Sequence, residues 1–451
     1  MLGLYNPIAT AHPSCSGTVS NPILSMISLF SSPLSLALIA SSLSVASADT
    51  LATEATQYKP TIASAYFTGW HSTNATPIFS VSDISWRRYT RMVYAFAETT
   101  SNIHSLSLSG SNPSSLPPFV AAAHKNNVNA IVSIGGWTGS RFWSTAVGSH
   151  DNRTAFVKTV TDFATQYKLD GLDFDWEYPV NQGIGCNIVN PNDTANYIKF
   201  LKLLRQDPVG AKLDLSAAVP VTPYNDASGK PYTDMSEFAQ YLDHIMIMNY
   251  DVWGPWSSAV GPIAPLNDTC AASANQQGSA VYAINAWRSA RVPAHKIVLG
   301  LASYGYSYQV AKKDAYVNGS TIQLAAYPRF NSNAHPKGDS WDNAALTPLD
   351  VCGNPQGNGG TWDMWSLVGA GLLTKEGKPV DGIPYRFDNC SQTAYVYRPN
   401  KEIMISFDDP RAYAAKGQFI KDQKLDGFAM WEAGGDYNNI LLDSVRNAAG
   451  F

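Results

Sequence analysis

Charged residues are scarce in this sequence: Asp, Glu, Lys and Arg together make up 15% of its 451 residues, and the formal net charge is −4. A nucleic-acid partner calls for a basic patch, which this composition does not supply. Aromatic residues, in contrast, reach 12%, with 12 Trp and 23 Tyr. Sugar rings present flat C–H faces, so a surplus of aromatic side chains fits a carbohydrate groove, although many of these rings also belong in a core.

Cysteine is rare as well, with five residues, and no spacing of Cys and His resembles a zinc site. The eight scattered His are therefore expected on the surface or in the core rather than as ligands. We expect neither a metal ion nor an organic cofactor.

The amino-terminal part lacks basic residues, since no Lys or Arg precedes Lys59. Ile23 to Ala48 is nevertheless almost wholly apolar or small and ends in Ala-Ser-Ala, which is typical of the hydrophobic region and cleavage site of a secretory signal peptide. Met26 begins a segment of more usual signal length, which makes residues 1–25 an upstream extension. A membrane anchor is the alternative, but Ser and Pro interrupt the segment. We expect residues 1–48 to be removed, and the mature chain to be secreted, monomeric and without stable membrane association.

Signal removal takes away Cys15 and leaves an even number of cysteines, which in a secreted chain predicts two disulfides with three alternative pairings. These cysteines are Cys186, Cys270, Cys352 and Cys390. Six N-x-S/T sequons agree with export and predict a glycoprotein. They begin at Asn74, Asn152, Asn192, Asn267, Asn318 and Asn389.

One apolar, aromatic stretch, Leu169–Pro179, contains four acids: Asp170, Asp173, Asp175 and Glu177. In a β-strand, residues two apart share a face, so the last three acids point one way at steps of roughly 6.6 Å while Leu, Phe, Trp and Tyr point the other way. Like charges at this spacing share protons, and at least one pKa is raised. An ion-paired acidic strand or a calcium loop is the alternative, but a calcium loop needs Gly and carbonyl-rich turns between its ligands. The pattern favours a carboxylic acid kept protonated for bond cleavage.

The sequence DGLDFDWEYP resembles the D-x-x-D-x-D-x-E signature of glycoside hydrolase family 18, the chitinase family. Four acids at fixed spacing with aromatics between them make chance matches rare. The layout of the chain resembles that of secreted fungal members.

Strand-like runs alternate with helix-compatible stretches after Lys59, which predicts a (β/α)8 TIM barrel of the α/β class. A doubly wound open sheet is the competitor, but it carries a Gly-rich phosphate-binding turn after its first strand, and this chain has none there. The eight runs are Ile62–Trp70, Met92–Ala97, Ala130–Trp137, Gly171–Tyr178, Leu213–Val221, His244–Tyr250, Ile297–Ser303 and Gly427–Glu432. Catalytic groups of such barrels lie at the carboxyl ends of the strands, where Glu177 falls.

About 120 residues separate the seventh run from the eighth, which predicts a small α+β insertion at 308–397 within a barrel formed by 60–307 and 398–451. Its sequence GGTWDMWSLVGAGLL resembles the helical part of the family's chitinase insertion domain, and strands are expected at Ala315–Val317 and Tyr395–Tyr397. Cys352 and Cys390 both fall in the insertion and are expected to pair. Cys186 and Cys270 follow the fourth and sixth strands on one face of the barrel, so we expect them to form the second disulfide.

Other strand ends supply the candidate groove. The third run ends in SIGGW (Ser133–Trp137), similar to the family's S-x-G-G motif, and the sixth ends in MNYD (Met248–Asp251). The resemblance implies that Tyr250 bonds the substrate's acetamido group, that Met248 and Asp251 line the same subsite, and that Trp431 is the barrel-floor ring. Further candidate contacts are Tyr66, Trp70, Trp137, Tyr178, Trp253 and Trp256. One departure is Tyr306, which stands where many relatives carry a basic residue.

Retaining glycosidases ordinarily use two carboxylates about 5 Å apart, one of them a nucleophile, and no second strand-end acid stands out here. The resemblance implies substrate-assisted catalysis instead, in which the sugar's 2-acetamido oxygen attacks the anomeric carbon. Glu177 is then the acid and base, Asp175 orients the acetamido group, and Asp173 shares the proton of Asp175. Asp170 is out of phase and is expected to be structural.

The predicted function is that of a secreted chitinase acting on chitin or chito-oligosaccharides. The alternatives are an endo-β-N-acetylglucosaminidase acting on N-glycans and a non-hydrolytic chitin-binding lectin. Non-catalytic family members typically have the acid Glu replaced, and Glu177 is present.

Overall fold

The computed structural model describes residues 58–342 and 348–451. The predicted signal peptide lies outside the described residues. Within them, no helix combines the length and apolar character that a membrane span requires.

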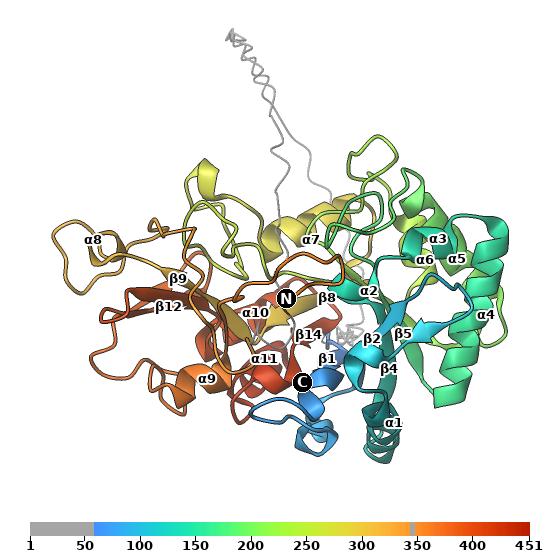
Figure 1. The fold of residues 1–451 in the computed structure, drawn as a ribbon, viewed down its shortest axis with the longest axis horizontal. Coiled ribbons are helices and arrows are strands. Elements are labelled where there is room, and N and C mark those ends of the chain that lie inside the picture. Colours follow the sequence, from blue (N-terminus) through green and yellow to red (C-terminus); the bar gives the residue numbers. More distant parts are fainter. Residues whose placement is uncertain (1–57, 343–347) are drawn as a thin grey trace, which may run out of the picture. The chain divides into compact units, whose positions relative to one another are not determined.

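The predicted barrel is confirmed: eight parallel strands pair in a closed ring, because the last of them, β14, pairs with both β8 and β1 (Figure 1). In order around the ring they are β1 (Ile62–Thr68), β2 (Arg91–Thr99), β4 (Asn129–Gly135), β5 (Gly171–Asp175), β6 (Asp214–Val219), β7 (His244–Ile247), β8 (Ile297–Ala302) and β14 (Gly427–Trp431). Each strand overlaps one of the expected runs. Every residue of β1, β5 and β8 is buried, as parallel strands covered on both faces require.

Helices connect most of the barrel strands and pack outside them (Figure 1). The longer ones are α1 (Leu116–Lys125), α4 (His150–Tyr167), α5 (Asp193–Gln206), α6 (Ser236–Tyr241), α7 (Ala280–Ser289), α10 (Pro410–Asp422) and α11 (Ile440–Ala449). Local sequence sets several starts: α10 begins with Pro410, and the side chain of Asp409 before it accepts from the backbone N–H of Ala412. No long helix follows β1 among the described residues, where 3-10 turns lead directly to β2.

A second, antiparallel sheet lies between β8 and β14 in sequence, with strand order β10-β9-β13-β12-β11. Its strands are β9 (Tyr304–Gln309), β10 (Thr361–Asp363), β11 (Tyr385–Asp388), β12 (Thr393–Arg398) and β13 (Ile403–Phe407). The short helices α8 (Lys312–Ala315) and α9 (Met364–Gly369) complete this α+β part of the chain, and α9 falls in the segment expected to be helical.

Of the two strands expected in this part, one is confirmed and the other is wrong. β12 contains the expected strand at Tyr395–Tyr397. The strand expected at Ala315–Val317 is wrong, because Ala315 ends α8 and Tyr316 forms only a single bridge with Leu324.

The expected disulfide pairing is also wrong. Cys186 is bonded to Cys352 and Cys270 to Cys390, with Cα–Cα distances of 5.7 and 6.3 Å. Each bond therefore joins a loop of the barrel to the segment between β8 and β14. Cys352 and Cys390 belong to the same segment but do not pair, because each lies against a different barrel loop. Cys352 contacts Ile184, and Cys390 contacts Asn267.

Candidate active site

The acidic stretch is a strand with the expected alternation. Asp173 and Asp175 lie on β5, and Glu177 follows two residues beyond its end; their exposures are 0, 4 and 9%. The opposite face is apolar: the ring of Trp176 stacks on Trp143 of α3 (Trp143–Val147), with ring centroids 5.5 Å apart. The strand thus presents carboxyl groups to one side and anchors itself in the aromatic layer on the other.

Asp173 is held by hydroxyl groups from three other strands. Its Oδ2 accepts from Tyr66 at 3.0 Å and Ser133 at 2.8 Å, and its Oδ1 accepts from Ser216 at 2.6 Å. Burial raises the pKa of Asp173, while the charge of Arg91 and these hydrogen bonds oppose the rise. Ser216 and Arg91 were not singled out from the sequence, because a lone Ser or Arg in a strand carries no motif.

The carboxyl group of Asp175 has an oxygen that is not hydrogen-bonded within the described structure. Its Oδ1 is buried and has no hydrogen-bond partner among the described residues. Burial raises the pKa of Asp175 well above its usual value, and the neighbouring carboxyl groups of Glu177 and Asp173 raise it further. A buried carboxyl oxygen without a partner is open to a donor from a bound molecule.

Burial raises the pKa of Glu177 to about 7, and the charge of Asp251 adds to this rise, while a hydrogen bond with Tyr178 opposes it. No Lys, Arg or His in the described ranges forms an ion pair with Glu177, which argues against an ion-paired acidic strand. Its backbone is fixed: the N–H donates to Ser140 Oγ at 2.9 Å, and the carbonyl accepts from Asn187 at 2.6 Å. A carboxyl group with this pKa can hold or release a proton near neutral pH.

Aromatic rings from three strand ends gather around Trp431, the last residue of β14. Phe96 stacks on it at 5.6 Å between centroids and 19° between planes, and Tyr66 lies at 5.2 Å. Trp70, just after β1, lies at 6.4 Å. Phe96 was not predicted, although its place near the carboxyl end of β2 is a signal that could have found it.

The sequence MNYD lies just beyond β7 and contributes to the same end of the barrel. Tyr250 and Met248 are half-buried, and burial together with the charge of Asp175 raises the pKa of Tyr250 well above its usual value. Asp251 accepts hydrogen bonds at a single oxygen, Oδ1, from the hydroxyls of Tyr304 at 2.6 Å and Tyr306 at 2.9 Å. Tyr306, at the position where many relatives carry a basic residue, therefore donates a hydrogen bond to this carboxylate without adding a positive charge.

The remaining candidate contacts differ in exposure. Trp137, Tyr178 and Trp256 are half-buried. Trp253 is only 1% exposed; its ring lies 5.3 Å from that of Tyr327 and closely approaches Gly261, so the protein itself covers it. Trp253 is a core residue here and is left out of the groove.

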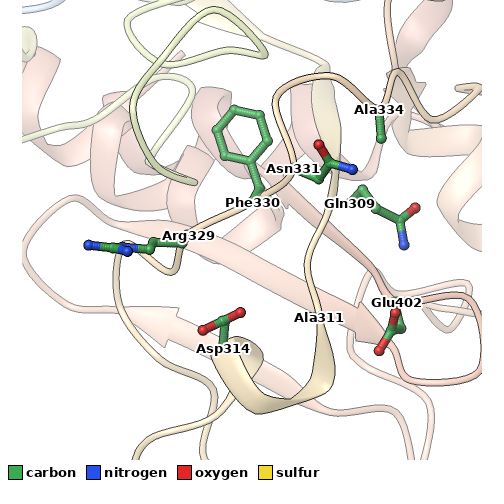
Figure 2. Close-up of a pocket in the computed structure, with 8 residues that line it drawn as sticks. All are labelled: Gln309, Ala311, Asp314, Arg329, Phe330, Asn331, Ala334 and Glu402. Carbon is green, nitrogen blue, oxygen red and sulfur yellow. The ribbon is translucent and has the colours of Figure 1, made fainter.

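Two further features bear on ligand binding. No group of three or more His, Cys, Asp or Glu in the described part of the chain could hold a metal ion. A hollow of about 580 Å³ lies beside β9 and α8, and Figure 2 shows Phe330, Arg329, Asp314 and Glu402 around it. None of the β5 acids lines this hollow, which lies at the opposite end of β9 from Tyr304.

A carboxyl group with a pKa near 7, a second buried acid beside it and an aromatic floor at the carboxyl ends of the strands define a glycoside hydrolase. The chain belongs to the family described as "Glycosyl hydrolases family 18", which matches residues 63–436. The acids, the strand-end Tyr250 and Trp431 all fall inside this range.

Some of the similar proteins are named as effectors and others as chitinases. A "chitinase-like effector" from Moniliophthora roreri is 53% identical over 86% of this chain and 93% of its own length. "Chitinase A1" from Niallia circulans is 29% identical over 71% of this chain and 42% of its own length. Among solved structures, a chitinase from Rhizomucor miehei superposes with a TM-score of 0.76 at 32% identity, over 86% of this chain and 99% of that one.

Proposed function

We propose that this chain is a secreted chitinase that hydrolyses β-1,4 linkages between N-acetylglucosamine units by substrate-assisted retaining catalysis. One observation carries the proposal: Glu177 is buried and forms no ion pair with a cation of the described residues, and burial raises its pKa to about 7. Such a group can deliver a proton to a glycosidic oxygen at the pH of many extracellular settings.

The first step follows from the two acids nearest the mouth. Glu177 donates its proton to the bridging oxygen as the bond to the anomeric carbon breaks. The carbonyl oxygen of the sugar's own 2-acetamido group attacks that carbon and closes a cyclic oxazolinium ion. The unpartnered Oδ1 of Asp175 accepts from the acetamido N–H, which orients the group and stabilises the positive charge that develops on it.

In the second step, Glu177, now a carboxylate, takes a proton from water as the water opens the oxazolinium ion with retention at the anomeric carbon. Asp173 stays deeper, where three hydroxyl donors hold it, and its charge and proton affinity bias the proton on Asp175 through the cycle. No protein nucleophile is required, which agrees with a row of acids that come from a single strand.

The substrate preference rests on the aromatic floor and the acetamido contacts. Trp431, flanked by Phe96 and Tyr66, offers a platform for the sugar at the cleavage point. Tyr250 completes the acetamido site from the end of β7, which is separated from β5 by β6 in the ring. Two disulfides that join distant loops fit an oxidising compartment and support secretion.

The experiment is product analysis on a chitin hexamer with the full chain and its Glu177→Gln variant. The wild type should release shorter N-acetylglucosamine oligomers, and the variant should lose about 10²–10⁴-fold in rate while still binding the hexamer. Glu237→Gln, at an exposed position on α6, is the matched control and should retain wild-type turnover. Substantial turnover by Glu177→Gln would overturn the acid assignment.

A non-hydrolytic chitin-binding protein is the second candidate, because relatives 53% and 50% identical to this chain are named chitinase-like effectors. Hexamer binding without release of products by the wild type would favour it. An endo-β-N-acetylglucosaminidase would instead release sugars from N-glycans faster than from the hexamer, so both substrates belong in the same assay.

A further inference from the structure

The carboxylate of Asp251 is held by a part of the chain outside the barrel. Both of its donors, Tyr304 and Tyr306, lie on β9, the strand that opens the antiparallel sheet directly after β8. Residues two apart on a strand share a face, so the two hydroxyls reach the same side and the same oxygen. The exposures of the two side chains are 7 and 5%, which means that packing fixes both rings.

Only one oxygen of Asp251 is used in this way. Oδ1 accepts from both tyrosines, and neither of these two bonds involves Oδ2. Two donors on one oxygen fix the carboxylate plane and leave the other oxygen available.

The donors are neutral. A Lys or Arg at this place would also hold the carboxylate, but its positive charge would cancel much of the field of Asp251 at neighbouring groups. A phenol hydroxyl is neutral, so it stabilises the anion without cancelling its negative charge. The charge of Asp251 acts on Glu177, which lies at the end of a different barrel strand.

We propose that Tyr306 is a positioning residue for the reaction: together with Tyr304 it holds the Asp251 carboxyl group in one orientation, favours its ionised form and thereby tunes Glu177, the proton donor of the first step. The inference rests on the proposed function, since it concerns the acid used there. It extends the site to β9, so that a strand of the antiparallel sheet contributes to the proton chemistry.

The surroundings of this pair are almost entirely acids and phenols. Around Asp251 and Glu177 the titratable groups are Asp173, Asp175 and Tyr178 on and after β5, Tyr66 on β1, Tyr224 after β6, Tyr250 after β7, and Tyr304, Tyr306 and Tyr308 on β9. The charge of Arg91 acts on Asp173. Among the described residues, the hydroxyls of Tyr304 and Tyr306 favour the ionised form of Asp251.

The sign of the expected effect follows from this dependence. Burial raises the pKa of Asp251, and the bonds from Tyr304 and Tyr306 lower it. Tyr306→Phe removes one of these bonds, so the pKa of Asp251 should rise. Asp251 then carries less negative charge near neutral pH, and the pKa of Glu177 should fall.

The test compares Tyr306→Phe with Tyr308→Phe in the full chain. Tyr308 lies on the same strand, two residues on, and its buried hydroxyl has no partner among the described residues, so its loss is the matched control. In the pH profile of kcat/KM on a chitin hexamer, the basic limb of Tyr306→Phe should move to lower pH than in the wild type. The limb of Tyr308→Phe should stay where the wild type has it.

A second comparison uses an Asp251→Asn background, in which Tyr306→Phe should cause no further shift because the carboxylate is gone. A shift of equal size with and without Asp251 would overturn the inference, as would equal profiles for Tyr306→Phe and Tyr308→Phe.

A readout independent of hydrolysis separates this inference from the proposed function. The carboxyl carbon of Glu177 can be followed by ¹³C NMR in Glu-labelled protein, with the resonance assigned by its loss in Glu177→Gln. Lack of hydrolysis by the wild type would refute the proposed function alone, and the NMR titration would still show whether Tyr306→Phe lowers the pKa of Glu177. An unchanged titration would refute the role of Tyr306 alone.

Discussion

Asp173 and Asp175 lie two residues apart on β5 and share a face, yet their surroundings are opposite. Three hydroxyl groups donate to Asp173, whereas Oδ1 of Asp175 is buried with no donor in the described structure. The first group is satisfied by the protein itself. The second is left for a donor that the protein does not supply, and the acetamido N–H of a bound sugar is a donor of the required kind.

This difference predicts a selective effect of Asp175→Asn. In the proposed mechanism Asp175 stabilises the oxazolinium ion by its negative charge, which the amide lacks, so kcat on chitin oligomers should fall about 10²–10³-fold. Steady-state kinetics on a soluble hexamer measure it.

Asp170→Asn is the control for that variant. Oδ2 of Asp170 accepts from the N–H of Ala130 at 2.8 Å and contacts His124 Nε2 at 2.9 Å, away from the site. We expect wild-type kcat and a lower free energy of unfolding, by about 1–2 kcal/mol. Equal kcat for Asp175→Asn and Asp170→Asn would contradict the role of Asp175.

Glu177 predicts a pH dependence of both activity and stability. The proton donor is lost as the pH rises through about 7, so kcat/KM should fall there. Between its usual value of 4.5 and about 7, the folded state holds a proton that the unfolded state has released, so the free energy of unfolding should decrease with rising pH over this interval.

Glu177→Gln should remove that decrease, because glutamine does not titrate. Relative to the wild type, the variant should gain roughly 2–3 kcal/mol in the free energy of unfolding between pH 4.5 and pH 8. Urea unfolding at both pH values gives the difference, and a constant gap between the two proteins would show that Glu177 is not buried in its neutral form.

The disulfides predict a specific pattern of cross-linked peptides. A non-reduced digest should contain Cys186 with Cys352 and Cys270 with Cys390. Cys352→Ser should lower the free energy of unfolding by about 2–5 kcal/mol, since the bond closes a separation of 166 residues. Recovery of Cys352 bonded to Cys390 would refute this arrangement.

The acetamido mechanism predicts which substrates are cleaved. Fully deacetylated chitosan lacks the internal nucleophile and should resist cleavage, whereas partly acetylated chitosan should yield products with N-acetylglucosamine at the new reducing end. Mass spectrometry of the products, with the chitin hexamer as positive control, checks both statements. Rapid breakdown of the deacetylated polymer would require a protein nucleophile.

The barrel and its acidic strand could be predicted from the sequence because both depend on local pattern. Alternation at a period of two residues sets which side chains of Leu169–Pro179 share a face, wherever the strand lies. The alternation of strands and helices similarly sets the order of elements, and the carboxyl-end rule then places Glu177, Tyr250 and Trp431 at one end of the barrel.

The tertiary structure alone decided which residues from distant segments meet. Cys352 lies beside Cys186 rather than Cys390, and Trp253 is covered by Tyr327 and Gly261. Ser216 and Tyr306 donate to site acids from other strands, and Arg91 donates to Ser216. No repeat or spacing encodes these contacts, because they depend on the three-dimensional course of loops between the elements. Local periodicity therefore determined the strand and the phase of its acids, and long-range packing determined their partners and hence the pKa values that make the site reactive.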